Sequence, residues 1–180
     1  AVECKEARDH LKSIQSELCP NRLEIWTDGS HSKESKIAGY GYRIRSFRNG
    51  IATLIKQKSS GLGVGTINQA ELTAIQDALQ WVSDHYSGHR DRQINIFTDS
   101  KYSYGRATID ATQISRQNFY ATEEILNLGH RLRHMGMQPT IHYCPSHIEK
   151  GMKVGAIEME GTKADKLANV GRINSDESDE

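Results

Sequence analysis

The sequence predicts one α/β domain in which helices flank a mixed β-sheet, and two observations support this fold class. The 180 residues suffice for a single hydrophobic core of ordinary size. Along the chain, a strand and a hairpin come first, and helical and strand patterns then alternate. That order is typical of a sheet whose later strands are parallel and are joined by right-handed crossovers.

The first half of the chain contains a helix, three strands and a second helix. Pro20 ends the first helical pattern, and Asn49-Gly50 between two β-type runs is the strongest short hairpin signal. Gly61–Gly65 breaks the strand pattern, and an apolar face that includes Ile75 then repeats at helical spacing. The predicted elements are a helical extension at residues 1–21, strands at 23–28, 37–47 and 51–58, and a helix at 69–85.

The second half alternates helices with strands and ends in a polar segment. The last residues, 174–180, are expected to form an acidic disordered tail, so the domain itself is expected to span residues 22–173. The predicted elements are a strand at 93–99, helical residues at 101–113, a helix at 121–134, a strand at 139–144, an irregular stretch at 145–161 and a helix at 162–170.

Charge and composition exclude several classes of protein. Lysine plus arginine and aspartate plus glutamate both number 23, so the net charge is zero and a polybasic nucleic-acid arm is excluded. Four of the acids lie in the last five residues, which leaves 19 acids against 23 bases and a mildly cationic body. No apolar run is long enough to span a membrane, and the three cysteines form no C-x-x-C pair. We therefore expect an intracellular protein that is not inserted in a membrane.

Two aspartates stand at the ends of two predicted strands. Asp28 follows Ile-Trp-Thr and Asp99 follows Ile-Phe-Thr, so the two strand endings have similar sequences. In α/β sheets, ligand sites gather at the carboxyl ends of the strands. Each aspartate also has a structural interpretation, because Asp28-Gly29 is a turn sequence and Asp99-Ser100 suits a helix cap.

Two further acids lie on predicted helices. Glu71 precedes Ile75 by one helical turn and so leaves from the sheet-facing side, although the helix dipole also favours a glutamate in a first turn. Asp165 borders the apolar side of the last helix near Ala168, and it equally suits a solvated helix surface. Four carboxylates brought together would repel one another, and two Mg²⁺ ions would balance their charge. Metal pairs of this kind serve in-line phosphoryl displacement.

Six short motifs occur in order along the chain. Their order and spacing resemble type 1 ribonuclease H, including the ribonuclease H domains of retroviral and retrotransposon reverse transcriptases. The resemblance extends from about Leu23 to Arg172. The motifs are T-D-G-S at residues 27–30, G-Y-G-Y at 39–42, N-Q-A-E-L at 68–72, T-D-S-K-Y at 98–102, C-P-S-H at 144–147 and A-D-K-L-A at 164–168.

The resemblance implies a ribonuclease H-like fold with a five-stranded mixed sheet of order 3-2-1-4-5. It implies an endonuclease that hydrolyses the RNA strand of RNA/DNA hybrids with two Mg²⁺ ions, or Mn²⁺, and leaves a 3′-hydroxyl and a 5′-phosphate. By resemblance, Asp28 bridges both metals, and Glu71 and Asp99 hold the metal on the leaving-group side. Asp165 completes the metal that positions the attacking water. A covalently linked polymerase domain is a further partner that the resemblance implies.

The resemblance also assigns a histidine and a set of substrate contacts. His147 matches the histidine that the family places on a mobile loop, where it assists product departure or proton transfer. Seventeen residues separate it from Asp165, a long loop that is similar to that of retroviral members. A lone histidine is otherwise more often structural. The expected contacts to 2′-hydroxyls, the RNA backbone and phosphate are Gly29, Ser30, Asn68, Gln69 and Lys101.

Two other functions stay open at this point. One is another nuclease of the wider ribonuclease H superfamily, against which the positions of Glu71 and Asp165 argue. The other is a catalytically silent domain that keeps the fold for structure or protein contact. Loss of metal ligands is typical of such a domain, and here all four acids are present.

Overall fold

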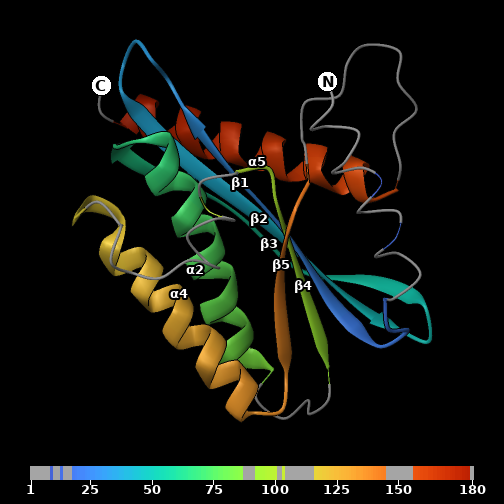
Figure 1. Cartoon of the computed structure of the whole chain (residues 1–180). Helices are drawn as coiled ribbons and strands as arrows, with labels where there is room; N and C mark the ends of the chain where they lie inside the picture. The colour runs from blue at the N-terminus through green and yellow to red at the C-terminus, as the bar shows by residue number, and fades with distance from the viewer. Residues whose placement is uncertain are drawn as a thin grey trace.

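The computed structural model describes residues 9, 13, 18–86, 92–100, 103, 116–144 and 156–178 (Figure 1). In the expected helical extension, the structure describes Asp9 and Ser13, and both are helical. In the helical segment expected at 101–113, it describes Ser103, which is also helical. The elements are β1 (Arg22–His31), β2 (Ile37–Arg48), β3 (Ile51–Val64), α2 (Ile67–His85), β4 (Gln93–Thr98), α4 (Arg116–His134), β5 (Gln138–Tyr143) and α5 (Ala156–Ser178).

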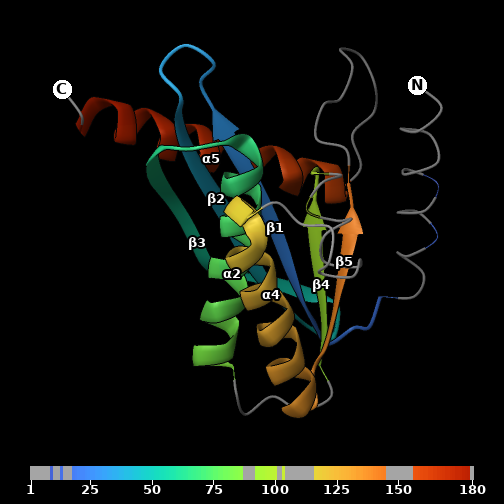
Figure 2. The same ribbon diagram turned by 60° about the vertical axis from the view of Figure 1, so that its left-hand side comes forward.

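The five strands form one mixed sheet in the order β3-β2-β1-β4-β5. The pairs β1–β2 and β2–β3 are antiparallel, and the pairs β1–β4 and β4–β5 are parallel. The helices α2 and α4 cover one face of the sheet, and α5 crosses the other face (Figures 1 and 2). This topology confirms the fold class and the sheet order expected from the sequence.

The hairpin between β2 and β3 turns at Asn49-Gly50, as predicted. Both residues have positive φ angles, 51° for Asn49 and 78° for Gly50, and Arg48 pairs with Ile51 across the turn. These φ angles are the ones that a tight hairpin turn requires, and asparagine and glycine tolerate them best. The hairpin places β2 beside β1 and leaves β3 at the edge of the sheet.

The helix α2 begins at Ile67, earlier than predicted, because Thr66 caps it. The Thr66 hydroxyl accepts a hydrogen bond from the backbone N–H of Gln69 at 3.1 Å. Glu71 therefore lies in the second helical turn, beyond the first turn in which the dipole favours an acid. The buried face of α2 packs with α4 on the main hydrophobic core, to which β1 contributes Ile25.

The G-Y-G-Y motif of β2 serves both faces of the sheet. Tyr40 and Tyr42 are buried in the main core under α2. Gly39 and Gly41 face α5, and a Cβ atom at Gly41 would lie 2.7 Å from the backbone nitrogen of Ala168. A side chain at either position would collide with the helix, so the two glycines allow α5 to lie directly on the sheet.

The helix α5 is longer than predicted at both ends. It begins at Ala156, inside the expected irregular stretch, and continues to Ser178, inside the expected acidic tail. Ser175 fixes the C-terminal end, because its Oγ accepts a hydrogen bond from the N–H of Gly63 at 2.9 Å. The strand β3 in turn runs to Val64, beyond the predicted end at residue 58. Tertiary packing of this kind stabilises helices more than local propensity does, so the local pattern could not predict these ends.

The remaining boundaries differ less from the predictions. β1 continues to His31 instead of stopping at Asp28, and α4 begins at Arg116 instead of near Ala121. β4 and β5 match the predicted strands to within one residue at each end. None of the helices in the described part of the chain is long and apolar enough to cross a membrane.

Candidate active site

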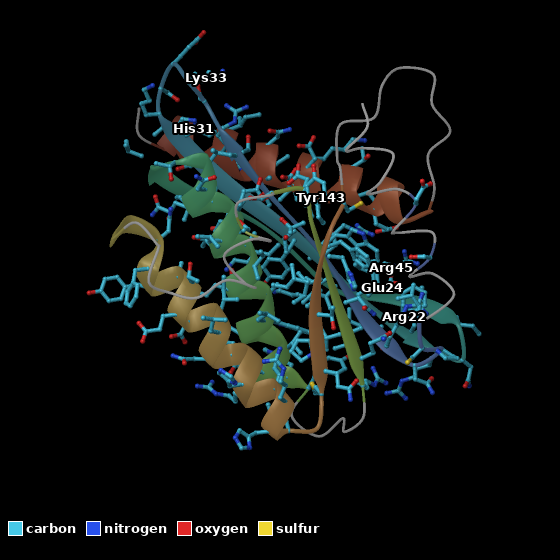
Figure 3. All side chains as sticks on the ribbon, in the orientation of Figure 1. Arg22, Glu24, His31, Lys33, Arg45 and Tyr143 are labelled. Carbon is cyan, nitrogen blue, oxygen red and sulfur yellow. The ribbon has the colours of Figure 1, made fainter. Side chains whose placement is uncertain are left out.

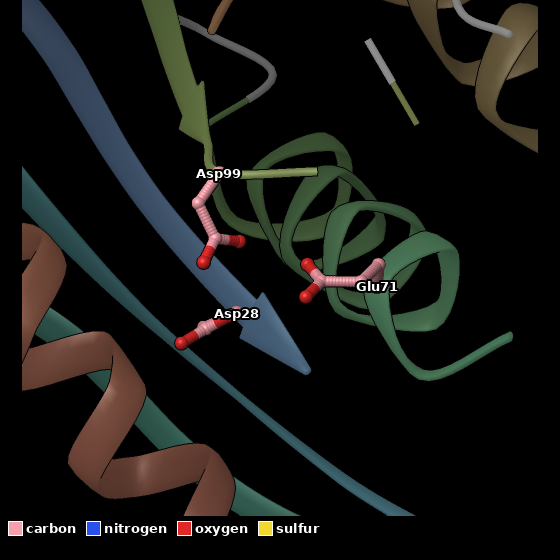
Figure 4. Close-up of side chains that lie close together, drawn as sticks. All are labelled: Asp28, Glu71 and Asp99. Carbon is pink, nitrogen blue, oxygen red and sulfur yellow. The ribbon is translucent and has the colours of Figure 1, made fainter. Parts of the chain in front are cut away.

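The parallel pairing of β1 with β4 brings the two aspartates together. Thr27 lies opposite Thr98, so Asp28 and Asp99 follow at the same level of the sheet. Glu71 reaches the same place from α2, and carboxylate oxygens of the three acids lie within 4.8 Å of one another. Figure 4 shows Glu71 and Asp99 directed toward β1, while the carboxyl group of Asp28 is turned toward the side on which α5 passes.

The local structure bears on the alternative interpretations of these acids. Asp28 and Gly29 lie inside β1 and not in a turn. After β4, Ser100 supplies a helix cap, because its Oγ accepts a hydrogen bond from the backbone N–H of Ser103 at 3.0 Å. Neither a turn at Asp28 nor the helix dipole at Glu71 therefore accounts for the acid found there.

Burial and mutual repulsion raise the pKa values of Asp28 and Glu71. Asp28 is 2% exposed and Glu71 is 5% exposed. Burial is the main cause that raises the pKa of Asp28, and the negative charges of Glu71 and Asp99 raise it further. Burial, followed by the charge of Asp99, also raises the pKa of Glu71 well above its usual range. Among the residues that the structure describes, burial and neighbouring acids thus outweigh any compensation of the negative charge at Asp28 and Glu71.

The donor set fits a hard divalent cation. Asp28 Oδ2 and Glu71 Oε2 are buried and receive no hydrogen bond from any residue that the structure describes. A buried acceptor without a partner costs about 1–3 kcal/mol, and coordination of a cation removes that cost. Oxygen ligands on opposite sides of a Mg²⁺ ion lie about 4.2 Å apart. The 4.8 Å limit on the cluster accommodates this distance, so these acids could hold a metal ion.

Asp165 approaches the site from α5. It lies outside the group of three acids whose oxygens are mutually within 4.8 Å, but it is close enough to Asp28 to raise the pKa of that carboxyl group. Asp165 is partly exposed, whereas Ala164 and Ala168 beside it are fully buried. The structure therefore places all four predicted acids around one point, with three in a tight group and the fourth on its α5 side.

The expected substrate contacts on β1 differ in their exposure to a ligand. Gly29 lies against the start of α2, and a Cβ atom there would be 2.8 Å from the backbone nitrogen of Glu71. Ser30 is 8% exposed, and its hydroxyl is engaged within the protein by Asn169 and Arg172 of α5. Gly29 thus sets the contact between two elements that carry acids, and the Ser30 side chain contacts α5.

Of the other four predicted site residues, the structure describes two. Asn68 and Gln69 lie in the first turn of α2, next to Glu71 in sequence, and Gln69 is exposed. Lys101 and His147 lie outside the described residues.

Sequence reasoning missed Asn169 and Arg172. Both lie on α5, at four and seven residues after Asp165, the spacing that places side chains on one face of a helix. This spacing from Asp165, a candidate metal ligand, was the one signal in the sequence that could have indicated Asn169 and Arg172. Their contacts with Ser30 link residues 139 and 142 positions apart and could not be seen in the sequence.

Comparison with known families agrees with this geometry. The family model of RNase H matches residues 20–173, and the chain therefore belongs to the RNase H family. No curated protein matches the chain.

Three solved structures illustrate the likeness of the fold. The RNase H domain of prototype foamy virus is 19% identical to this chain, with a TM-score of 0.66. The match covers 86% of this chain and 96% of the viral domain. The N-terminal RNase H domain of Rv2228c from Mycobacterium tuberculosis is 18% identical, with a TM-score of 0.65 and coverages of 89% and 99%. The foamy virus protease-reverse transcriptase in complex with RNA/DNA hybrid is 18% identical, with a TM-score of 0.62. The match covers 85% of this chain but only 20% of the longer viral protein.

Proposed function

We propose that this chain is a metal-dependent endonuclease that hydrolyses the RNA strand of RNA/DNA hybrids. The observation that carries the proposal is the group of Asp28, Glu71 and Asp99, of which the first two are buried, with Asp165 beside it, in a chain of the RNase H family. Membership in this family supports ribonuclease H activity in general. The catalytic assignment of the individual residues is part of the proposal.

The proposed cofactor is Mg²⁺, or Mn²⁺ in its place, with two ions per site. When bound, such ions supply charge that favours attack of water on a phosphodiester and departure of the leaving oxygen. Asp28 is assigned to both ions, because Glu71 and Asp99 lie within 4.8 Å of its carboxylate and Asp165 also interacts with it. Glu71 and Asp99 are assigned to the leaving-group ion, and Asp165 is assigned to the ion that positions the attacking water.

The proposed substrate rests on the neighbouring structures and on the exposed start of α2. The foamy virus protein that resembles this chain is in complex with RNA/DNA hybrid and combines its RNase H domain with a reverse transcriptase. This likeness supports a covalently linked polymerase domain as the proposed partner. Asn68, Gln69 and the backbone of Gly29-Ser30 flank the acids and are assigned to 2′-hydroxyl groups near the scissile phosphate. Lys101 is assigned to phosphate.

The direct test is incubation of the chain with a labelled RNA/DNA hybrid, with and without Mg²⁺. Single-stranded RNA, duplex RNA and duplex DNA serve as comparison substrates, and Asp28→Asn serves as the matched inactive variant. We expect Mg²⁺-dependent cleavage of the hybrid alone, with loss of cleavage in the variant. Absence of cleavage by the folded wild-type chain would indicate a catalytically silent domain, and equal cleavage of duplex DNA would indicate another nuclease.

A second substrate comparison tests how ribose is recognised. A hybrid strand with one ribonucleotide embedded in DNA satisfies one of several 2′-hydroxyl contacts. Each lost hydrogen bond costs on the order of 1 kcal/mol, so two or three losses should slow cleavage by roughly 10- to 200-fold. Equal rates on the all-ribose strand and the single-ribonucleotide strand would refute recognition of several consecutive riboses.

A further inference from the structure

We infer that Asn169 is a positioning residue that holds the carboxylate of Asp165 beside Asp28, and that Ser30 and Arg172 support it. This inference rests on the proposed function, because it concerns an acid that the proposal assigns to the metal site. Asp165 is partly exposed and stands apart from the three acids that form the tight group. A side chain with this freedom needs a partner that selects one orientation.

A chain of hydrogen bonds reaches Asp165 from the C-terminal side of α5. Arg172 Nε donates to Ser30 Oγ at 2.9 Å, and Ser30 Oγ donates to Asn169 Oδ1 at 2.6 Å. Asn169 Nδ2 lies 3.5 Å from Asp165 Oδ2, a contact that is longer than the usual range of about 2.7–3.2 Å for an N–H···O hydrogen bond. The chain thus connects a permanent cation to the candidate metal ligand through two neutral side chains.

The chemistry of the donors gives this chain one direction. An arginine donates hydrogen bonds and accepts none, so the Ser30 hydroxyl receives one from Arg172 and is free to give its own proton to Asn169. The Asn169 amide then presents its oxygen to Ser30 and its NH₂ group to Asp165. An ionised carboxylate accepts hydrogen bonds, so Asp165 is a suitable end for the chain.

The same contacts join β1, which carries Asp28, to α5, which carries Asp165. Asp28 and Ser30 are alternate residues of β1 and therefore point to the same face of the sheet. Asp165, Asn169 and Arg172 share one face of α5. The hydrogen bonds of Ser30 to Asn169 and Arg172 thus hold α5 against β1 next to the site, and the distance between Asp28 and Asp165 depends on them.

This arrangement separates two roles for Ser30. The hydroxyl of Ser30 is used inside the protein, which leaves its backbone for the proposed contact with substrate. Ser30→Ala should therefore change metal binding and not the preference for ribose. A residue that read the substrate through its side chain would show the opposite behaviour.

The test is calorimetric titration of the full, metal-free chain with MnCl₂. The variants are Asn169→Ala, Ser30→Ala and Asp28→Asn, and Asn174→Ala is the matched control, because Asn174 is an exposed asparagine of the same helix. Loss of a group that orients a metal ligand typically weakens metal binding by 10- to 100-fold, and we expect about 10-fold for Asn169→Ala. Asn174→Ala should bind as the wild type does. Thermal melting of each variant checks that it is folded.

The outcomes distinguish this inference from the proposed function. If Asp28→Asn binds Mn²⁺ as the wild type does, the proposed metal site is wrong. If Asp28→Asn loses binding but Asn169→Ala binds normally, with or without a lower melting temperature, the positioning role is overturned and the proposed function stands. Ser30→Ala should weaken Mn²⁺ binding while keeping the wild-type ratio of rates on all-ribose and single-ribonucleotide strands. A changed ratio with normal Mn²⁺ affinity would also overturn the inference.

Discussion

Two buried acids of this molecule have similar exposure and opposite surroundings. Glu160 of α5 is 6% exposed and Asp28 of β1 is 2% exposed. Glu160 accepts hydrogen bonds from Arg43 Nε at 3.2 Å and from Lys163 Nζ at 2.9 Å, and Arg45 Nη1 lies 3.0 Å from its carboxylate. Asp28 is surrounded by other acids. In Figure 3, Arg45 lies toward one end of the sheet together with another labelled acid–base pair, Arg22 and Glu24.

On the proposed function, the difference separates a structural acid from an acid of the metal site. Burial opposes ionisation of Glu160, but the hydrogen bond from Lys163 and the charges of Arg45 and Arg43 together lower its pKa. Burial and neighbouring acids instead raise the pKa of Asp28. Where the chain supplies its own cations, the acid is neutralised and serves packing. At Asp28, where the causes of the pKa shift in the described residues are burial and other acids, the proposal assigns the compensating charge to a cation from solution.

The largest expected effect is on catalysis by Asp28→Asn. The variant removes a carboxylate that the proposal assigns to both metal ions, so Mg²⁺-dependent hybrid cleavage should fall by at least roughly 1,000-fold, which corresponds to about 4 kcal/mol of transition-state stabilisation. The free energy of unfolding in the absence of metal should not fall, because repulsion with Glu71 and Asp99 is relieved. Asp99→Asn should behave in the same way. Near-normal turnover by either purified variant would contradict its assignment as a metal ligand.

The second expected effect is on stability by Glu160→Gln. Removing this charge leaves Arg43, Arg45 and Lys163 without their common partner, and the first two are largely buried. Water still reaches these three ion pairs in part, which weakens each of them. The free energy of unfolding should therefore fall by about 1–3 kcal/mol. Urea unfolding measures this change. Hybrid cleavage by the folded variant should stay near wild type, and a loss as large as that of Asp28→Asn would remove the distinction between the two acids.

A third prediction concerns His147 and follows from the sequence, since this residue lies outside the described part of the chain. A group that moves protons without holding a metal contributes less than a ligand, because water can replace it. His147→Ala should slow cleavage by roughly 100-fold, the low end of the range for a general acid or base. Single-turnover kinetics on the hybrid measure the effect. A loss as complete as that of Asp28→Asn would mean that His147 is a ligand or an essential base.

The smallest expected effect is a dependence of stability on pH. A carboxyl group whose pKa is raised in the folded state binds its proton longer than in the unfolded state, so stability is lost as pH rises above the ordinary value near 3.8. In metal-free solution, the gain in melting temperature from Asp28→Asn should therefore be larger at about pH 8 than at about pH 4. The pKa of Glu160 is lowered, so its contribution has the opposite sign and is lost as pH falls below about 4.5. A gain that is independent of pH would contradict the raised pKa of Asp28.

Local patterns predicted the parts of the molecule that depend on neighbours in sequence. Turn chemistry predicted the Asn49-Gly50 hairpin, and helix periodicity predicted the sheet-facing side of Glu71. The similar strand sequences before Asp28 and Asp99 indicated that the two acids lie at one level of the sheet, although β1 does not end at Asp28 but continues to His31. The extent of β3 and α5 was not, because Gly63 and Ser175, which fix their ends, are 112 residues apart.

The partners of the acids could not be predicted either. Arg43 and Glu160 are separated by 117 residues, and Ser30 and Asn169 by 139. Whether a buried acid has a cation beside it depends on such contacts between distant segments. The sequence therefore indicated which acids gather at the sheet edge, but not which acids the protein itself neutralises.

The most direct test of this contrast is the effect of Mg²⁺ on thermal unfolding of the metal-free chain. The melting temperature would be measured with and without millimolar MgCl₂ for the wild type, Glu160→Gln and Asp28→Asn. An ion that binds the folded state at about 100 times its dissociation constant adds about 2.7 kcal/mol to stability. We predict that Mg²⁺ raises the melting temperature of the wild type and of Glu160→Gln and leaves that of Asp28→Asn unchanged. An equal rise in all three proteins, or no rise in the wild type, would contradict the account.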